Sequence, residues 1–259
     1  MKIVSWNINS LRAHEIAFRK AITELNPDIF CLQEIRVRED QQTFPVKGFR
    51  SYMNPAERSQ YYGTGVYIKN NIYPRSIVFD SPLDGYDYDG RIMAIELNSF
   101  YLVNSYWPFS AYDKNNRWLN YRLKWNKYFQ QFILSLQKKK SVVICGDMNM
   151  VRCDCDSFDM KSVRNVGCFY PEEHDAFERL IETANLVDSY SALLAPDESV
   201  KYTVWTNSKD GETRCEGRGF RIDYFLVEKA LMQKVRSSKI MDNIYGSDHC
   251  PILLDIELE

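Results

Sequence analysis

Four apolar runs in the sequence end in acidic or amide residues. They are Trp6-Asn7-Ile8-Asn9, Leu32-Gln33-Glu34, Gly146-Asp147-Met148-Asn149 and Gly246-Ser247-Asp248-His249. One carboxylate at a strand end can be a simple turn cap, but four such ends together are hard to explain as caps. Carboxylate and amide oxygens suit hard divalent ions, and Mg²⁺ takes one or two carboxylates together with oxygens of a substrate phosphate. The pattern therefore indicates metal-assisted chemistry at a phosphate.

Hydrolysis of a phosphodiester makes three demands on such a site. The charge on the phosphoryl oxygens must be neutralised, a water molecule must be activated, and the departing alkoxide must be stabilised. A metal ion, Asp147 and His249 could divide these tasks. The other two histidines, His14 and His174, stand apart from any acidic motif, and we expect them at the surface.

The elements that must position these residues are short strands and a few helices. Apolar runs rich in Val, Ile, Tyr and Phe predict strands at residues 3–6, 29–32, 65–68, 76–79, 92–97, 101–106, 142–145, 222–227 and 252–258. Helical periodicity predicts helices at 15–25, 120–137 and 172–185. So many strands favour two sheets with helices on their outer faces. No linker composition divides the chain, so we expect one α+β domain over residues 1–259.

Charge and cysteine content limit the partners and the compartment. The net charge of −2 argues against wholesale wrapping of nucleic acid but leaves room for a local basic face. Cys31 and Cys145 lie in apolar runs, where reduced buried thiols are expected. Cys153 and Cys155 flank Asp154, and we expect loop thiols there because no second Cys/His pair lies at zinc spacing.

The sequence begins without a signal-peptide pattern and has no apolar run long enough to span a membrane. We therefore expect an intracellular protein with no membrane partner. In a bacterium or archaeon it would be cytoplasmic and associated with the nucleoid, and in a eukaryote it would be nuclear.

A series of segments along nearly the whole chain matches, in order, the motifs of a known family. They are Ser5-Trp6-Asn7-Ile8-Asn9-Ser10-Leu11-Arg12-Ala13, Cys31-Leu32-Gln33-Glu34, Asn54-Pro55-Ala56-Glu57-Arg58, Asp89-Gly90-Arg91, Gly146-Asp147-Met148-Asn149, Arg221-Ile222-Asp223-Tyr224-Phe225 and Gly246-Ser247-Asp248-His249-Cys250-Pro251. The chain thereby resembles the exonuclease III family of abasic-site endonucleases, in the endonuclease/exonuclease/phosphatase superfamily. The resemblance implies a deoxyribonuclease I-like fold, a four-layer α/β-sandwich of two packed mixed β-sheets flanked by helices.

The resemblance also implies an activity and a metal. The activity is that of a DNA-repair nuclease, which hydrolyses the phosphodiester 5′ to an abasic site in duplex DNA and has 3′–5′ exonuclease and 3′-end-cleaning activity. Its partner would be duplex DNA with abasic sites or 3′-blocked ends, and it would act as a monomer. Glu34, with Asn7 and Asp248, would hold the main Mg²⁺ ion, which Mn²⁺ could replace. The wider metal-binding set would add Asp147, Asn149 and His249.

The remaining catalytic roles follow from the same resemblance. Asp147, beside Asn149, would position or deprotonate the attacking water. Tyr106 would contact the scissile phosphate or help the leaving group, although core packing alone could explain a Tyr at the end of an aromatic strand. His249, oriented by the carboxylate of Asp223, would donate to a non-bridging phosphate oxygen.

Family members hold a base-free deoxyribose, flipped out of the helix, in an apolar pocket. Trp205, Phe220 and Ile222 fall at or beside the pocket positions. Flipping a nucleotide without a base loses no pairing or stacking, so such a pocket selects damage. Further backbone or phosphate contacts are expected from Arg12, Arg36, Tyr61 and Asn165.

Two positions depart from the family pattern. Phe109 stands where many members carry an amide that touches the target phosphate, and Val204 replaces an aromatic residue of the pocket. The balance between abasic-site incision and exonuclease action therefore stays open.

Two alternative functions share the same core residues. One is a phosphatase or phosphodiesterase acting on inositol phosphates or sphingomyelin. Inositol phosphatases tend to carry Pro-Ala-Trp-Cys-Asp-Arg where this chain has Phe220-Arg221-Ile222-Asp223-Tyr224, and secreted sphingomyelinases need a signal peptide. The other is a catalytically inactive binding module. We would expect such a module to have lost one of Glu34, Asp147, Asn149, Asp223, Asp248 and His249, and all are present.

Overall fold

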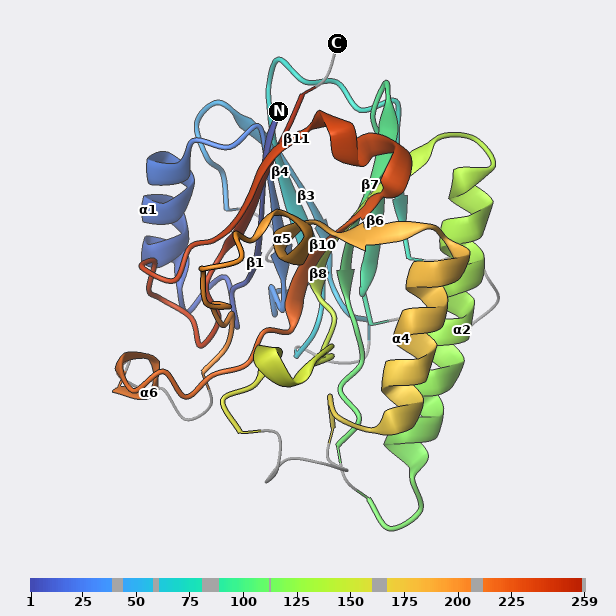
Figure 1. Cartoon of the computed structure of the whole chain (residues 1–259). Coiled ribbons are helices and arrows are strands. Elements are labelled where there is room, and N and C mark those ends of the chain that lie inside the picture. Colours follow the sequence, from blue (N-terminus) through green and yellow to red (C-terminus); the bar gives the residue numbers. More distant parts are fainter. Residues whose placement is uncertain are drawn as a thin grey trace.

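The computed structural model describes residues 1–38, 44–57, 61–80, 89–111, 113–159, 167–205 and 212–257. In this part of the chain two six-stranded mixed sheets lie face to face, with helices on the outer side of each (Figure 1). The expected four-layer α/β-sandwich is confirmed.

The first sheet has the strand order β11-β12-β1-β2-β4-β3. Its strands are β1 (Lys2–Asn7), β2 (Ile29–Gln33), β3 (Phe49–Asn54), β4 (Thr64–Lys69), β11 (Val235–Ile240) and β12 (Ile252–Ile256). The central neighbours β1 and β2 are parallel, and α1 (Glu15–Leu25) connects them. The other pairs in this sheet are antiparallel.

The second sheet has the order β5-β6-β7-β8-β10-β9. Its strands are β5 (Ser76–Phe79), β6 (Ile92–Glu96), β7 (Phe100–Tyr106), β8 (Ser141–Asp147), β9 (Leu186–Asp188) and β10 (Asp223–Glu228). Here β7 and β8 are the parallel pair, joined through α2 (Arg117–Gln137), and their neighbours are antiparallel. Besides α4 (Pro171–Thr183), the shorter helices are η2 (Asp154–Asp156), α5 (Ser189–Leu193), α6 (Glu212–Cys215) and η3 (Lys229–Lys234).

Three apolar layers hold the sandwich together. The innermost interleaves buried side chains of both sheets, among them Ile3, Val66, Leu102 and Phe225. The outer face of the first sheet packs against α1, and that of the second packs against α2 and α4, as Figure 1 shows. Burial of these faces is the main favourable contribution to folding. None of the helices in the described part of the chain has the length and apolar composition of a membrane span.

The predicted helices and strands all occur, with ends shifted by a few residues, and the last strand ends at Ile256. Leu258, expected in that strand, lies outside the described residues. Three strands were not predicted from the sequence, namely β3, β9 and β11, and each lies at a sheet edge. Edge strands bury less of each face, so their sequences carry less of the apolar pattern that predicts a strand.

The cysteines follow the expectation with one correction. Cys31 and Cys145 are free and buried, as predicted. Cys153 and Cys155 were expected as loop thiols, but the structure joins them in a disulfide. The turn at η2 brings their Cα atoms to 5.4 Å, which is within the range that a disulfide spans.

Candidate functional site

The carboxyl ends of the two parallel strand pairs meet at one edge of the sandwich. Asn7 is the last residue of β1, and Glu34 follows the last residue of β2. In the second sheet Tyr106 ends β7 and Asp147 ends β8, and the two residues are neighbours in the β7–β8 register. Residues that are distant in the sequence thus come together because strands in the middle of a sheet aim them.

Sharp turns follow these strand ends. Asn9, Glu34 and Asn149 have positive φ angles of 47°, 48° and 43°. This backbone conformation is uncommon for residues other than glycine and is often found at functional sites. At Gly146, where φ is 135°, a Cβ would lie 1.8 Å from the carbonyl oxygen of Ser105. Only glycine therefore permits β8 to approach β7 so closely directly before Asp147.

Asn7 connects the acidic groups of the two sheets. Its Nδ2 donates to Oε1 of Glu34 at 2.9 Å and to Oδ2 of Asp147 at 2.8 Å. Asn9 donates from Nδ2 to Oδ1 of Asp248 at 2.9 Å. Glu34 also accepts from the guanidinium of Arg36, at 3.1 Å from its Nε. These hydrogen bonds place Glu34, Asp147 and Asp248 around one small region.

His249 lies between two carboxylates. Its Nδ1 is 2.9 Å from Oδ2 of Asp223, and its Nε2 is 3.8 Å from Oδ2 of Asp147. Burial alone would lower the pKa of His249, but the charges of Asp223 and Asp147 and the hydrogen bond to Asp223 raise it to about 10. The imidazole is therefore held in its charged form, which suits an anionic partner.

Asp147 has an environment that disfavours its own charge. Burial, and after it the charge of Asp223, raises the pKa of Asp147 to about 7, against the lowering effect of His249. A carboxylate with a pKa near neutrality can exchange a proton with water at physiological pH. Its Oδ1 accepts from the backbone N–H of Asn149 at 2.9 Å, which fixes its orientation.

The acidic groups here fit a metal ion. Ligand atoms of Asp147, Asp223 and His249 all lie within 4.8 Å of one another, and the two carboxylates offer oxygen donors while His249 is charged. Oδ1 of Asp223 is buried and has no hydrogen-bond partner in the structure, so it has an unused lone pair. A cation here would neutralise the repulsion between the two carboxylates. Glu34 and Asp248, expected as ligands, lie at the same edge and reach this group through Asn7 and Asn9.

Tyr106 is buried at the end of β7 with its ring beside the acids. Burial, followed by the charges of Glu34 and Asp147, raises the pKa of Tyr106 well above its usual value. The phenol therefore stays protonated and can donate a hydrogen bond. The guanidinium of Arg91 lies 5.1 Å from its ring centroid and 4.1 Å from that of Tyr62.

A cleft of about 990 Å³ opens over this edge. Its floor includes Glu34, Tyr106, Asp147, Asn149 and His249. Its walls are rich in aromatic and basic side chains, namely Arg36, Tyr61, Tyr62, Arg91, Phe109, Trp118 and Tyr121. The predicted contact residues Arg36 and Tyr61 thus line the cleft, Arg12 is exposed, and Asn165 lies outside the described residues.

The three residues expected to form an apolar pocket are only partly together. Phe220 and Ile222 belong to one buried apolar group with Val151 and Val204. Trp205 packs instead with the core between the sheets, and its indole lies beside Gly219. In this structure the side chains of Phe220 and Ile222 are buried within that group. Neither of them lines the cleft.

Sequence reasoning gave no role to several residues of the cleft. Arg91 is only 3% exposed, pairs with Asp89, and stacks on Tyr62 of the wall and Tyr106 of the floor. The Asp89-Gly90-Arg91 segment was among the motifs of the resemblance, and that was the signal that could have identified this arginine. A buried arginine with aromatic contacts is a stronger candidate for a role in the site than an exposed arginine, which is usually a solvated charge.

Comparison with known proteins agrees with this geometry. Residues 4–249 match the model of the Endonuclease/Exonuclease/phosphatase family. An exodeoxyribonuclease of Bacillus subtilis is 32% identical over all of both chains. A DNA-(apurinic or apyrimidinic site) endonuclease of Dictyostelium discoideum is also 32% identical, over 100% of this chain and 71% of its own. The crystal structure of an AP endonuclease from Leishmania major superposes with a TM-score of 0.87 at 26% identity, covering 100% of this chain and 88% of that one. The chain belongs to the Endonuclease/Exonuclease/phosphatase family.

Proposed function

We propose that this protein is a DNA-repair nuclease that hydrolyses the phosphodiester 5′ to an abasic site in duplex DNA. We propose further that it removes nucleotides and blocking groups from 3′ ends, and that residues 1–259 act as one catalytic domain and as a monomer. The observation that carries the proposal is the convergence of Glu34, Asp147 and His249 on the floor of one cleft, with Asp223 behind the His249 ring. The kinds of enzyme named among its relatives support it.

The metal in this proposal is Mg²⁺, with Mn²⁺ as a substitute. Glu34, Asn7 and Asp248 would hold the ion, and Asp147 and Asn149 complete the surrounding set of oxygen donors. These hard donors suit such a cation, whereas His249, also expected in the set, is protonated on both ring nitrogens and would lie beside the ion without ligating it. When bound, the ion would neutralise charge on the phosphate oxygens.

Asp147 is the proposed general base. Its carboxylate lies on the cleft floor, and its pKa of about 7 matches the task of accepting a proton from the attacking water. Asn149 holds the turn that carries Asp147, because its Nδ2 donates to the carbonyl oxygen of Trp107 at 2.9 Å.

His249 and Tyr106 are the proposed donors to the phosphate. With Asp223 on its Nδ1, the His249 ring presents a charged Nε2–H toward the cleft, where it would bind a non-bridging oxygen. The protonated phenol of Tyr106 lies across the same floor and would contact the scissile phosphate or assist the leaving oxygen.

Selection of abasic DNA would come from the apolar group around Phe220 and Ile222, which is packed outside the cleft lining in this structure and would have to open toward the cleft. A base-free sugar is small enough to enter such a group once it opens, whereas an intact nucleotide would clash with it. Arg36, Tyr61 and Asn165 would contact the DNA backbone.

One panel of substrates tests this function. Duplexes carrying an abasic site, a plain nick, a 3′-phosphate or an RNA:DNA hybrid are incubated with Mg²⁺, Mn²⁺ or EDTA, and the products are separated on a denaturing gel. We expect incision 5′ to the abasic site, a 3′-hydroxyl product, and no cleavage in EDTA. Undiminished cleavage in EDTA would contradict the metal assignment. Equal rates on abasic and intact duplexes would contradict the substrate assignment.

A further inference from the structure

The proposed reaction gives no role to Arg221, although its neighbours in the sequence all belong to the site. Phe220 and Ile222 form the apolar group, and Asp223 binds His249. The side chain of Arg221 is 1% exposed and carries a charge. A buried charge is costly unless it is fully paired, so Arg221 requires partners inside the protein.

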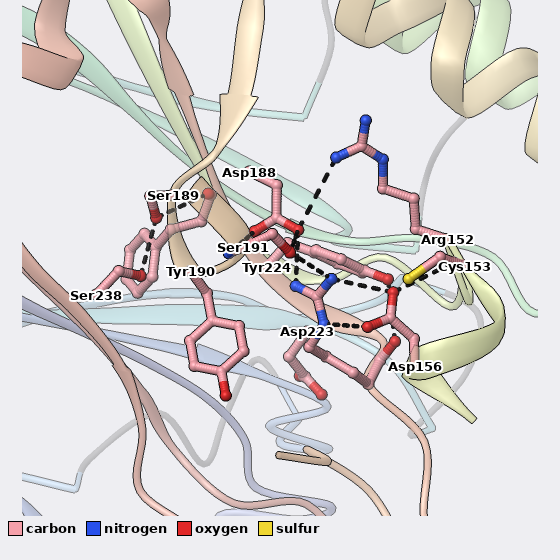
Figure 2. A network of polar contacts seen from close by, with 12 residues as sticks. Arg152, Cys153, Asp156, Asp188, Ser189, Tyr190, Ser191, Asp223, Tyr224 and Ser238 are labelled. Carbon is pink, nitrogen blue, oxygen red and sulfur yellow. Dashed lines mark hydrogen bonds and ion pairs between the residues drawn. The ribbon is translucent and has the colours of Figure 1, made fainter. Parts of the chain in front are cut away.

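Four hydrogen bonds satisfy the guanidinium of Arg221. Nε and Nη2 donate to the two oxygens of Asp156 at 2.6 and 3.0 Å, which is a bidentate pair. Nη1 donates to Oδ2 of Asp188 at 2.7 Å, and Nη2 also donates to Oγ of Ser191 at 2.9 Å. We call Arg221, Asp156, Asp188 and Ser191 the Arg221 cluster. Figure 2 shows Asp156, Asp188 and Ser191 converging on this network, with the ring of Tyr224 beside it.

The cluster ties together segments that are distant in the sequence. Asp156 comes from η2, Asp188 ends β9, and Ser191 lies in α5. Arg152 lies at the edge of the cluster, with its Nη1 4.0 Å from Oδ2 of Asp188, while its Nε and Nη2 donate to the carboxylate of Glu178. Only the planar fork of an arginine can serve Asp156, Asp188 and Ser191 together in this geometry.

Backbone hydrogen bonds connect the Arg221 cluster to Asp223 and His249. The backbone N–H of Arg221 donates to the carbonyl oxygen of Asp156 at 2.8 Å, and its carbonyl oxygen accepts from the hydroxyl of Tyr224 at 3.0 Å. The next residue, Ile222, accepts from the N–H of Met148 at 2.9 Å, directly after Asp147. One residue further, Asp223 holds the His249 ring.

The cluster also supports the apolar group. Asp156 is followed by Ser157, which forms a β-bridge with Phe220. The ring of Phe158 then packs at 5.3 Å from that of Phe220. The bidentate pair between Arg221 and Asp156 therefore holds both sides of this contact in place.

We propose that Arg221 is a positioning residue for the nuclease reaction. Its bidentate bond to Asp156, secured by Asp188 and Ser191, fixes residues 220–223, so that Asp223 keeps the His249 ring oriented and Phe220 keeps its place in the apolar group. Arg221 acts through these residues, since its side chain bonds to Asp156, Asp188 and Ser191 and lies outside the cleft lining. This inference rests on the proposed function for its kinetic consequence, but not for its structural one.

The first test is Arg221→Lys, which keeps the charge and removes the fork. On an abasic duplex with Mg²⁺ we expect kcat to fall about 10–100-fold, as for loss of other orienting partners, with KM changed by less than about twofold. The preference for abasic over intact duplex should fall as well. In a His249→Ala background the same substitution should cost less than about twofold, because residues that act as one unit are not additive.

A second readout is independent of activity. In the parent protein the Nδ1 proton of His249, hydrogen-bonded to Asp223, should give a downfield proton NMR signal, and Arg221→Lys should shift or broaden it. Ser191→Ala removes two hydrogen bonds of the cluster, from Arg221 and to Asp188, and leaves the pair between Arg221 and Asp156 in place, so it serves where Arg221→Lys does not fold, and it should shift the signal in the same direction. Ile95→Ala, in buried β6, is the control that lowers the melting temperature but leaves kcat and the His249 signal unchanged.

Two results would overturn the inference. One is an unchanged His249 signal in both cluster variants. The other is a loss of kcat in Arg221→Lys that does not depend on His249. This would appear as a loss that adds fully to that of His249→Ala, or as an equal loss of kcat in Ile95→Ala at the same melting temperature. Failure of the proposed function is distinguishable, because the parent protein would then cleave none of the duplexes while the NMR comparison still tests the link from Arg221 to His249.

Discussion

The floor and the rim of the cleft are built in different ways. The floor consists of largely buried side chains at or beside strand ends, namely Glu34, Tyr106, Asp147, Asn149 and His249, and the hydrogen bonds of Asn7 and Asp223 hold three of them from behind. The rim consists of the aromatic and basic side chains of the cleft walls, on connecting segments and on the first turns of α2, and several of them are exposed. Tyr61, Phe109 and Trp118 have exposed fractions of 67%, 49% and 46%.

This difference separates two requirements of a nuclease. Chemistry at a phosphate needs groups held within a fraction of an ångström, which strand ends in two packed sheets can provide. Choice among DNA substrates needs contacts that adapt to a large, variable surface, which connecting segments can provide. We therefore expect substitutions on the floor to change kcat by orders of magnitude, and those on the rim to change binding modestly.

The largest expected effect is that of Asp147→Asn. The amide cannot accept a proton from water, so kcat should fall by about 10²–10⁴ while DNA binding persists. The fold should survive, because the substitution removes a buried charge whose ionised form burial disfavours. Single-turnover cleavage and thermal melting measure the two properties. A variant within about tenfold of the parent kcat would remove Asp147 from the role of base.

Glu34→Ala should act through the metal. Loss of a carboxylate ligand lowers metal affinity, so we expect the Mg²⁺ concentration for half-maximal rate to rise by about 10–100-fold or more, with partial recovery at high Mg²⁺. A Mg²⁺ titration of the cleavage rate measures this, with Lys139→Ala, exposed after α2, as the control. A lower rate at every Mg²⁺ concentration, with an unchanged midpoint, would mean that Glu34 acts otherwise.

Asp223→Asn should weaken catalysis by about 10–100-fold, since His249 loses its orienting partner. The effect should largely vanish in a His249→Ala background.

The free energy of unfolding of Asp223→Asn, measured in EDTA, should differ from that of the parent protein by an amount that depends on pH. The pKa of His249 is raised from 6.5 to about 10, so its contribution to stability is complete below pH 6.5 and is lost as the pH rises toward 10. The deficit of Asp223→Asn, about 1–3 kcal/mol at low pH, should therefore shrink between these values.

The pair assignment fails if thermal melts show the same deficit at every pH. Additive losses of kcat, explained by a lower melting temperature, would likewise leave His249 to act alone.

The smallest expected effect is on the rim, at Arg36→Ala. Removing one phosphate contact should raise KM about 2–5-fold and reduce the salt dependence of binding by about one unit of slope, with kcat little changed. Because Arg36 also binds Glu34, this variant tests where the floor ends. If kcat falls instead of binding, Arg36 belongs to the floor and the division between floor and rim must be redrawn.

The sequence predicted the floor better than the rim for a physical reason. Asn7, Glu34 and Asp147 lie within two residues of the end of an apolar run, so strand periodicity alone indicated that a rigid backbone aims them. The pairing of Asp223 with His249 came from the family resemblance, because nothing in a spacing of 26 residues predicts a 2.9 Å contact. The packing of Trp205 with the core depends on tertiary contacts that periodicity does not encode.

Edge strands and the partners of buried arginines could not be predicted from the sequence pattern. β3 and β11 pair on one side only, and their sequences, such as Val235–Ile240, mix apolar and polar residues. From the sequence alone Arg91 and Arg221 look like ordinary charged residues. The structure shows the aromatic rings and carboxylates that contact them.

The two sheets have the same strand arrangement. In each, a parallel pair occupies the middle, flanked by two antiparallel strands on either side, and a helix links the pair as β1-α1-β2 or β7-α2-β8. In topology the molecule is therefore approximately twofold symmetric, and Glu34 after β2 occupies the place equivalent to Asp147 at the end of β8. One carboxylate lies beside an arginine and the other beside a histidine and a second acid. The repeated topology supplies two equivalent positions, and their unlike neighbours suit one to the proposed role of metal ligand and the other to the proposed role of base.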